Sequence, residues 1–260
     1  MRFRFELTPL EEVHPWGSVT PNLHWFGLTD GLYCLDVGGV ELLRYTDRTM
    51  DWLTTQRDRP PLPWVDYYVV RLWEDMLAAL PYILEPVPDD LVDYMVTGSM
   101  VPVDLDDSIL DDPAVDAAWD ASGERRVDTS YLRFGPTLSW CRTLDPVDTV
   151  TVGWHTTADP DGEIAFTAPL SGRVSVTTAE FIDAVTDFDR RLFESMRVRV
   201  DRLAETGPPD GIELDIPHLI REHEDRRTWL ARAMSRQVGT DWEAVRAGVA
   251  ILVQPGVGQK

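Results

Sequence analysis

The most strongly patterned part of the chain is residues 176–209, VTTAEFIDAVTDFDRRLFESMRVRVDRLAETGPP. Thr177 and Glu180 have the spacing of a capping box, in which each side chain binds a backbone N–H at the start of a helix. Gly207 and the two prolines after it are a stop signal, because glycine suits the C-cap and proline cannot continue a helix. The pattern predicts a helix over 178–206, which would be roughly 40 Å long.

Apolar residues recur along this helix at steps of three and four, so that they form one stripe. The stripe consists of Phe181, Val185, Phe188, Leu192, Met196, Val200 and Leu203. A helix of this length must pack along most of a domain. We therefore expect it to be the organising element, with its stripe buried against strands from both halves of the chain.

The remaining elements predict an α+β fold in which antiparallel sheet meanders are covered by helices. Strands are expected at 2–7, 131–134, 137–142, 149–156, 163–167 and 173–176. Helices are expected at 64–84, near 90–96, at 114–121, 217–236 and 241–252, and Pro81 should kink or end the first of them. We expect a single domain over 1–260, with 1–125 and 126–260 as possible packed halves.

The net charge is -21, from 45 acidic and 24 basic residues. This charge disfavours nucleic acid and anionic membranes as partners and favours a basic protein partner. The longest apolar runs are too short to span a membrane, and the N-terminus does not resemble a signal peptide, so we expect a cytoplasmic protein. Cys34 and Cys141 are expected to be two buried free thiols, which suits a reducing compartment.

The chain has no P-loop, no GxGxxG after a strand and no GxSxG, so no cofactor is expected. Trp16 and Trp119 are expected to be exposed, and exposed tryptophans mark interfaces. Trp73, Trp140 and Trp154 fit core positions. These features favour a non-enzymatic acidic binding protein, such as an immunity protein that neutralises a toxin, with its oligomeric state left open.

Three runs at 23–28, 32–37 and 40–45 are joined by Asp30-Gly31 and Gly38-Gly39, which suit two-residue hairpin turns. The resulting meander would place Trp25 opposite Asp36 and Asp36 opposite Glu41. Adjacent carboxylates repel, so a cation, an arginine or a shared proton should compensate. Trp25, Asp36 and Glu41 are therefore a candidate pocket for the alternative function, an enzyme or small-molecule binder. The competing interpretation is a sheet rim that an arginine neutralises.

Two other groups of residues could bind ions. His218, Glu222 and His223 lack the spacing of two histidines four apart, and Asp104–Ser108 lacks the glycine of a calcium loop, so no metal site is expected. Arginines gather on the long helix at positions 190, 191, 197, 199 and 202. They could form an anion-binding patch, but we favour a solvated face on which they pair with neighbouring carboxylates.

Several phrases of the sequence resemble an uncharacterised family of proteins from high-GC soil bacteria. They are Met1–Leu7, the run LHWFGLTDG at 23–31, Glu41–Tyr45, the run YLRFGP at 131–136, and Phe188–Leu192. Because that family has no known function, the resemblance implies a bacterial, cytoplasmic origin but no activity and no catalytic residue.

Overall fold

The computed structural model describes residues 1–56, 62–97 and 111–253 and has the predicted α+β fold, with two antiparallel sheets. The first sheet contains β1 (Arg2–Leu7), β2 (Asp30–Val37), β3 (Val40–Leu42) and β4 (Val65–Tyr68). β1 lies along one edge of β2, and β3 and β4 share the other edge. The second sheet has the order β5 (Arg126–Asp128), β6 (Thr137–Thr143), β7 (Thr149–His155) and β8 (Ser171–Thr177).

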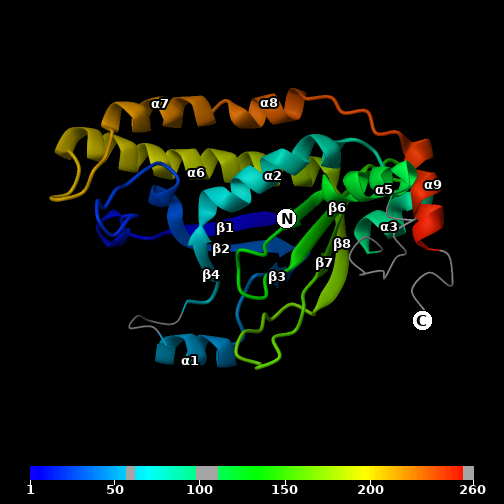
Figure 1. Ribbon diagram of the computed structural model, residues 1–260, viewed down its shortest axis with the longest axis horizontal. Coiled ribbons are helices and arrows are strands. Elements are labelled where there is room, and N and C mark those ends of the chain that lie inside the picture. The colour runs from blue at the N-terminus through cyan, green and yellow to red at the C-terminus, as the bar shows by residue number, and fades with distance from the viewer. Residues whose placement is uncertain (57–61, 98–110, 254–260) are drawn as a thin grey trace.

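Helices lie over both sheets in layers (Figure 1). They are α1 (Asp47–Gln56), α2 (Val69–Leu84), α3 (Val92–Val96), α5 (Pro113–Gly123), α6 (Thr178–Thr206), α7 (Ile216–Arg226), α8 (Trp229–Ser235) and α9 (Trp242–Leu252). Short 3-10 turns occur at Leu10–Glu12, Gly27–Thr29 and Asp89–Leu91. Figure 1 shows α7 running alongside α6, and α3, α5 and α9 gathered at one end of the molecule, while α8, which follows α7, packs on α2.

The predicted long helix is confirmed as α6, including both of its ends. The Thr177 side chain accepts from the Glu180 backbone N–H, Glu180 accepts in return from Thr177, and Gly207 at the C-cap has a φ of 79°. Every residue of the predicted stripe is buried. The helix contacts β1 of the first sheet and β7 and β8 of the second, so both sheets pack on one element. The ring of Phe188 stacks on that of Phe3 at 4.8 Å.

One hydrophobic cluster includes residues of both sheets, among them Tyr33 of β2 and Trp140 of β6. Helix α2 contacts strands of both sheets, as α6 does. The sheets also meet at the β2–β3 turn, where a Cβ on Gly38 would lie only 2.7 Å from Val174 of β8. A smaller cluster under α3, α5 and α9 covers the opposite face of β6, where Cys141 lies. The central strands β6 and β7 of the second sheet are therefore buried on both faces, whereas the edge strand β8 is more exposed.

The predicted meander is half right. Gly38 and Gly39 both have positive φ and form the expected turn, and Asp36 faces Glu41 as predicted. Residues 23–28 are not a strand, however, and Asp30-Gly31 begins β2 instead of turning the chain. A Cβ on Gly31 would lie 2.4 Å from the Glu6 carbonyl oxygen, so this glycine allows close packing against β1. The predicted pairing of Trp25 with Asp36 is therefore wrong.

Other boundaries differ from the prediction. The helix expected from residue 64 begins at Val69, because residues 65–68 pair with β2 as β4, and it continues through Pro81 to Leu84. No strand forms at 131–134, where Phe134 has a φ of 56°, or at 163–167. The helix expected at 217–236 is divided into α7 and α8. Turns interrupt the regular hydrogen bonding at 131–134 and between α7 and α8. Residues 163–167 are irregular apart from an isolated bridge between Phe166 and Tyr45.

The remaining expectations concern the cysteines, membrane-spanning helices and the calcium-like run. Cys34 and Cys141 are buried and free as predicted, and burial raises the pKa of each thiol to about 12. Among the helices within the described ranges, none combines the length and apolar character needed to cross a membrane. The calcium-like run Asp104–Ser108 lies outside the described residues.

Candidate functional site

The predicted carboxylate pair is held by arginines. From β1, Arg4 donates through Nη1 to Glu41 Oε1 at 2.7 Å and through Nη2 to Asp36 Oδ2 at 2.9 Å. Arg44 donates to the second oxygen of Glu41 at 2.8 Å, and Asp36 also accepts from the Gly39 N–H at 3.2 Å. The pair is thus a neutralised rim of the first sheet, which is the competing interpretation of the sequence.

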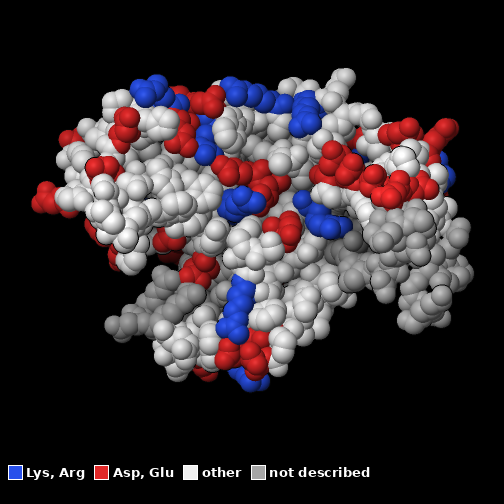
Figure 2. Space-filling model, viewed as in Figure 1, with Lys and Arg blue, Asp and Glu red and all other residues white. Residues whose placement is uncertain are grey.

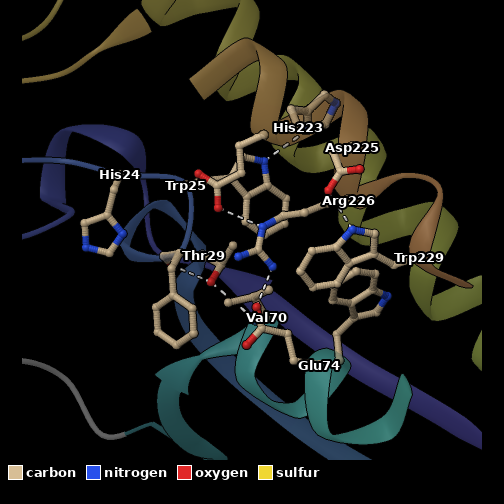
Figure 3. A network of polar contacts seen from close by, with 12 residues as sticks. His24, Trp25, Thr29, Val70, Glu74, His223, Asp225, Arg226 and Trp229 are labelled. Carbon is tan, nitrogen blue, oxygen red and sulfur yellow. Dashed lines mark hydrogen bonds and ion pairs between the residues drawn. The ribbon is translucent and has the colours of Figure 1, made fainter. Parts of the chain in front are cut away.

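Trp25, the third residue of the candidate pocket, belongs to a different network (Figure 3). Its side chain is fully buried, and its indole N–H donates to His223 Nδ1 at 3.2 Å. The Arg226 guanidinium lies between two indoles, 4.6 Å from the centre of the Trp25 ring and 4.7 Å from that of Trp229. Arg226 also donates to Glu222 and to Glu74 of α2. This network connects α7 to α2. Trp25 belongs to it and therefore does not form a pocket with Asp36 and Glu41.

The histidines of α7 face different surroundings. His218 is exposed and its Nε2 lies 3.7 Å from Glu222, whereas His223 is buried against Trp25. No group of three or more metal-ligating side chains is found in the part of the chain that the structure describes.

The arginines of α6 are only partly on a solvated face. Arg191 pairs with Asp187 at 2.9 Å, as their spacing predicts, but Glu194 pairs with Arg190 at 2.8 Å instead of with Arg197. Arg199, however, is buried and donates to the backbone carbonyls of Leu28 and Thr8. The expectation of a solvated side chain is wrong for Arg199, because it satisfies carbonyls where the first sheet meets α6.

A cleft that the sequence did not predict lies between α5, the start of α9 and the end of α2. Its volume is about 400 Å³. We call it the acidic cleft, because three carboxylates line it against one arginine. The lining residues are Tyr82, Ala117, Asp120, Ala121, Glu124, Arg236, Gln237, Val238, Gly239, Thr240, Asp241 and Val245.

The carboxylates of the acidic cleft are only weakly compensated. Arg236 donates to the Tyr82 hydroxyl at 3.1 Å and lies 5.3 Å from the centre of its ring, rather than pairing with an acid. Tyr82 also hydrogen-bonds with Glu124, and this bond raises the pKa of Tyr82. Across the described residues, neither Asp120 nor Glu124 forms an ion pair. Neither carboxylate is held by an ion pair, although Glu124 also interacts electrostatically with the neighbouring Arg125.

The base of the acidic cleft is rigid because of the buried side chain of Arg125. Its guanidinium donates to Glu85 at 2.5 Å, to the Ala121 carbonyl at 2.8 Å and to Thr240 at 3.3 Å. It also lies 4.8 Å from the centre of the Trp242 ring. Burial lowers the pKa of Arg125, but an arginine starts so high that it stays charged. Arg125 thus joins the ends of α2 and α5 to the start of α9.

An exposed tryptophan stands on α5, the helix that contributes to the lining of the acidic cleft, although it is not itself part of that lining. Trp119 is 38% exposed, and it lies between Asp116 and Asp120 on the outer face of the helix. Trp16 is 42% exposed, so the predicted exposure of both tryptophans is confirmed. Figure 2 shows Asp and Glu side chains gathered over α5 and α9, whereas Lys and Arg side chains line the edge formed by α7 and α8. The acidic cleft therefore lies in an acidic region of the surface, and α5 also carries an exposed aromatic residue.

One carboxyl group inside the molecule is strongly perturbed. Burial raises the pKa of Asp75 on α2 to about 6, although Arg71 donates to it at 3.1 Å and opposes this effect. Arg71 also lies over the ring of Tyr131 at 5.5 Å, and the hydroxyl groups of Tyr131 and Tyr33 are 3.3 Å apart. No sequence pattern marks Asp75, because its burial depends on residues that are far away in the chain.

Comparison with known proteins identifies one family. The model of a family of unknown function (DUF5984) matches residues 2–248, which is nearly the whole chain. No curated protein and no solved structure matches the chain. The resemblance to a family without known function is therefore confirmed, and the role of the chain has to be inferred from its own residues.

Proposed function

Because the chain belongs to the DUF5984 family, whose function is unknown, we propose from its own surface that it is a non-enzymatic acidic protein that binds a basic protein partner. The acidic cleft is the proposed contact surface, with the exposed Trp119 on another side of α5 as a second, aromatic contact. The observation that carries the proposal is a preformed cleft whose carboxylates Asp120 and Glu124 form no ion pair within the described ranges.

The charge distribution supports this role. The chain has a net charge of -21, and many of its arginines form ion pairs within the molecule, for example Arg4, Arg125, Arg142 and Arg226. Arginines held in this way cannot screen the acids that remain unpaired. An acidic field of this kind speeds the encounter with a cationic partner and repels nucleic acid.

The shape of the surface supports a side chain with a positive end. A volume of about 400 Å³ is sufficient for a lysine or arginine side chain, with Tyr82 and Val245 beside its apolar stem and Asp120 and Glu124 near its charge. Trp119 supplies the kind of aromatic residue that contributes most at protein interfaces. The Arg125 network keeps the cleft open before binding, which reduces the entropic cost of association.

The partner class that fits is a cationic protein, such as a toxin whose basic surface an immunity protein would cover. A cytoplasmic location is part of the proposal, and the two buried, free thiols are compatible with a reducing compartment. The alternative function, an enzyme or small-molecule binder at Asp36 and Glu41, has less support, because Arg4 and Arg44 already occupy these carboxylates.

The test is a titration with a short peptide that carries three arginines separated by glycines. Binding is followed by NMR through the backbone amides of α5 and the indole N–H of Trp119. We expect saturable shifts at the acidic cleft, and binding that weakens as salt rises, since charges are screened beyond ~10 Å at ~0.1 M. The double variant Asp120→Asn/Glu124→Gln should weaken binding by about 10-fold, which corresponds to ~1.4 kcal/mol.

The matched control is Asp201→Asn/Glu205→Gln on α6. These two residues are also exposed, are four apart on a helix, and have no ion pair within the described ranges. The control removes the same charge, so it should change the affinity by less than about 2-fold if the acidic cleft is the site. Equal weakening by both variants would mean that the peptide responds only to the net charge, and the proposed site would be wrong.

A further inference from the structure

A second cavity, of about 460 Å³, lies between α6 and α7 on a different part of the molecule. It is lined mainly by charged side chains, and three of them are the arginines Arg190, Arg197 and Arg227. In this lining the three arginines outnumber the two acids, Asp189 and Glu194, which is unexpected in a chain whose net charge is -21. We call this cavity the α6–α7 cleft.

The buried histidine His223 also lines the α6–α7 cleft and has a hydrogen-bond donor without an acceptor. An indole N–H can only donate, so the bond from Trp25 Nε1 makes Nδ1 of His223 the acceptor. In the neutral ring the proton must then be on Nε2. The ring is 3% exposed, and Nε2 has no hydrogen-bond partner in the described part of the chain. Figure 3 shows this second nitrogen on the side away from Trp25.

A buried donor without a partner is unusual in a native protein, because such groups normally bind a protein acceptor, a water, an ion or a ligand. The bond from Trp25 orients the ring, so the Nε2–H group is fixed in position. Burial lowers the pKa of His223, which keeps the ring neutral near pH 7 and preserves this arrangement of donor and acceptor. His223 is thus a preoriented donor rather than a surface charge.

The cations of the cleft differ in how strongly they are engaged. Arg190 is held by Asp187 and Glu194, and Arg227 pairs with Glu224 at 3.2 Å. Arg197 is exposed and makes no hydrogen bond or ion pair within the described ranges. It is available to an anion.

The acids of the cleft are already engaged. Glu194 binds Arg190, and Asp189 accepts from the indole N–H of Trp73 at 3.0 Å. Burial raises the pKa of Asp189, while the hydrogen bond from Trp73 opposes this effect. The unpaired Arg197 and the donor His223, with Arg227 shared with Glu224, therefore determine what the cleft attracts.

We propose that the α6–α7 cleft binds an oxyanion, a phosphate or carboxylate group carried by a small organic molecule. Arg197 and Arg227 supply the positive charge, and His223 Nε2 donates a hydrogen bond to one oxygen. The cavity is larger than a bare oxyanion needs, and Phe193 provides an apolar wall for the rest of the molecule. This site is independent of the acidic cleft and takes a ligand of opposite charge.

The test is a titration with inorganic phosphate, and separately with benzoate, against chloride at constant ionic strength. The imidazole nitrogens of His223 are followed by long-range ¹H–¹⁵N NMR. We expect a saturable shift of Nε2 with at least one of the two anions, and the anion that saturates distinguishes a phosphate group from a carboxylate. Arg197→Gln, a change at an exposed position, should weaken this binding by about 10-fold, because a charge-assisted bond is lost.

The matched control is Arg221→Gln, which removes the same charge from an exposed position on α7 outside the lining of the cleft. It should change the affinity by less than about 2-fold. The proposal is overturned if neither anion gives a saturable shift at His223, or if both variants weaken binding equally. Because the arginine peptide binds elsewhere, its result does not affect this test.

Discussion

Replacing Asp75 by asparagine should change how the stability of the protein depends on pH. Burial raises the pKa of this carboxyl from an ordinary 3.8 to about 6. A raised pKa means that the folded state binds the proton more tightly than the unfolded state, so stability falls as the pH rises from about 4 through about 6. Above both values the loss is about 3 kcal/mol, because each pKa unit corresponds to ~1.36 kcal/mol.

Asparagine has nearly the shape of the protonated acid, and its carbonyl can still accept from Arg71. We therefore expect Asp75→Asn to be similar in stability to the parent near pH 4 and more stable by up to ~3 kcal/mol near pH 8. Urea unfolding at a series of pH values measures both free energies. The many other acids affect parent and variant equally, so the difference between the two curves isolates Asp75.

The control is Asp51→Asn on the exposed face of α1, for which the difference from the parent should stay near zero. Two results would refute the reasoning about Asp75. One is a difference between variant and parent that does not change with pH. The other is a variant that is less stable near pH 8, which would mean that the ionised carboxylate, with Arg71, contributes to the fold.

Three further predictions concern packing and charge. Leu192→Ala should cost ~2–5 kcal/mol in urea unfolding, because Leu192 is fully buried where α6 meets the sheets; a loss below ~1 kcal/mol would mean that α6 is peripheral. Asp36→Asn should destabilise by ~0.5–1 kcal/mol and Arg4→Ala by more, because Arg4 serves two carboxylates; a stabilised Asp36 variant would contradict this. Gly248→Ala should separate α9 from α5 and reduce peptide binding at the acidic cleft, because its Cβ would overlap the Ala114 carbonyl oxygen at 1.9 Å; unchanged melting and binding would contradict this.

The sequence was sufficient to predict elements whose signals are local. The capping box, the apolar stripe and Gly207 all lie within α6 or directly after it, so the helix was predicted with correct ends. Gly38-Gly39 likewise forms a turn through its own positive φ angles. In these cases the residues that determine the structure are neighbours in the chain.

The sequence was insufficient where the role of a residue depends on a contact with a residue far away in the chain. Asp30-Gly31 resembles a hairpin turn, but Gly31 is required because the backbone of β1 lies directly against it. The same holds for the candidate sites. In the sequence, Arg125 stands in a charged run directly after α5, as residues at a helix end often do. In the structure it is buried by contacts with Glu85 and Trp242, which are far away in the sequence. No pattern within a window of the chain contains that information.

The two buried thiols can report whether the two sheets unfold together. Cys34 lies in β2 of the first sheet and Cys141 in β6 of the second. Because a thiol with a pKa of about 12 is almost entirely protonated and both are shielded from solvent, a thiol reagent can label either one only after its sheet opens. Peptide mapping of the labelled protein therefore gives two independent opening rates, one for each sheet, without any engineered probe. Rates that rise together with urea would identify the two sheets on α6 as one unfolding unit, and rates that diverge would identify the sheet that opens first.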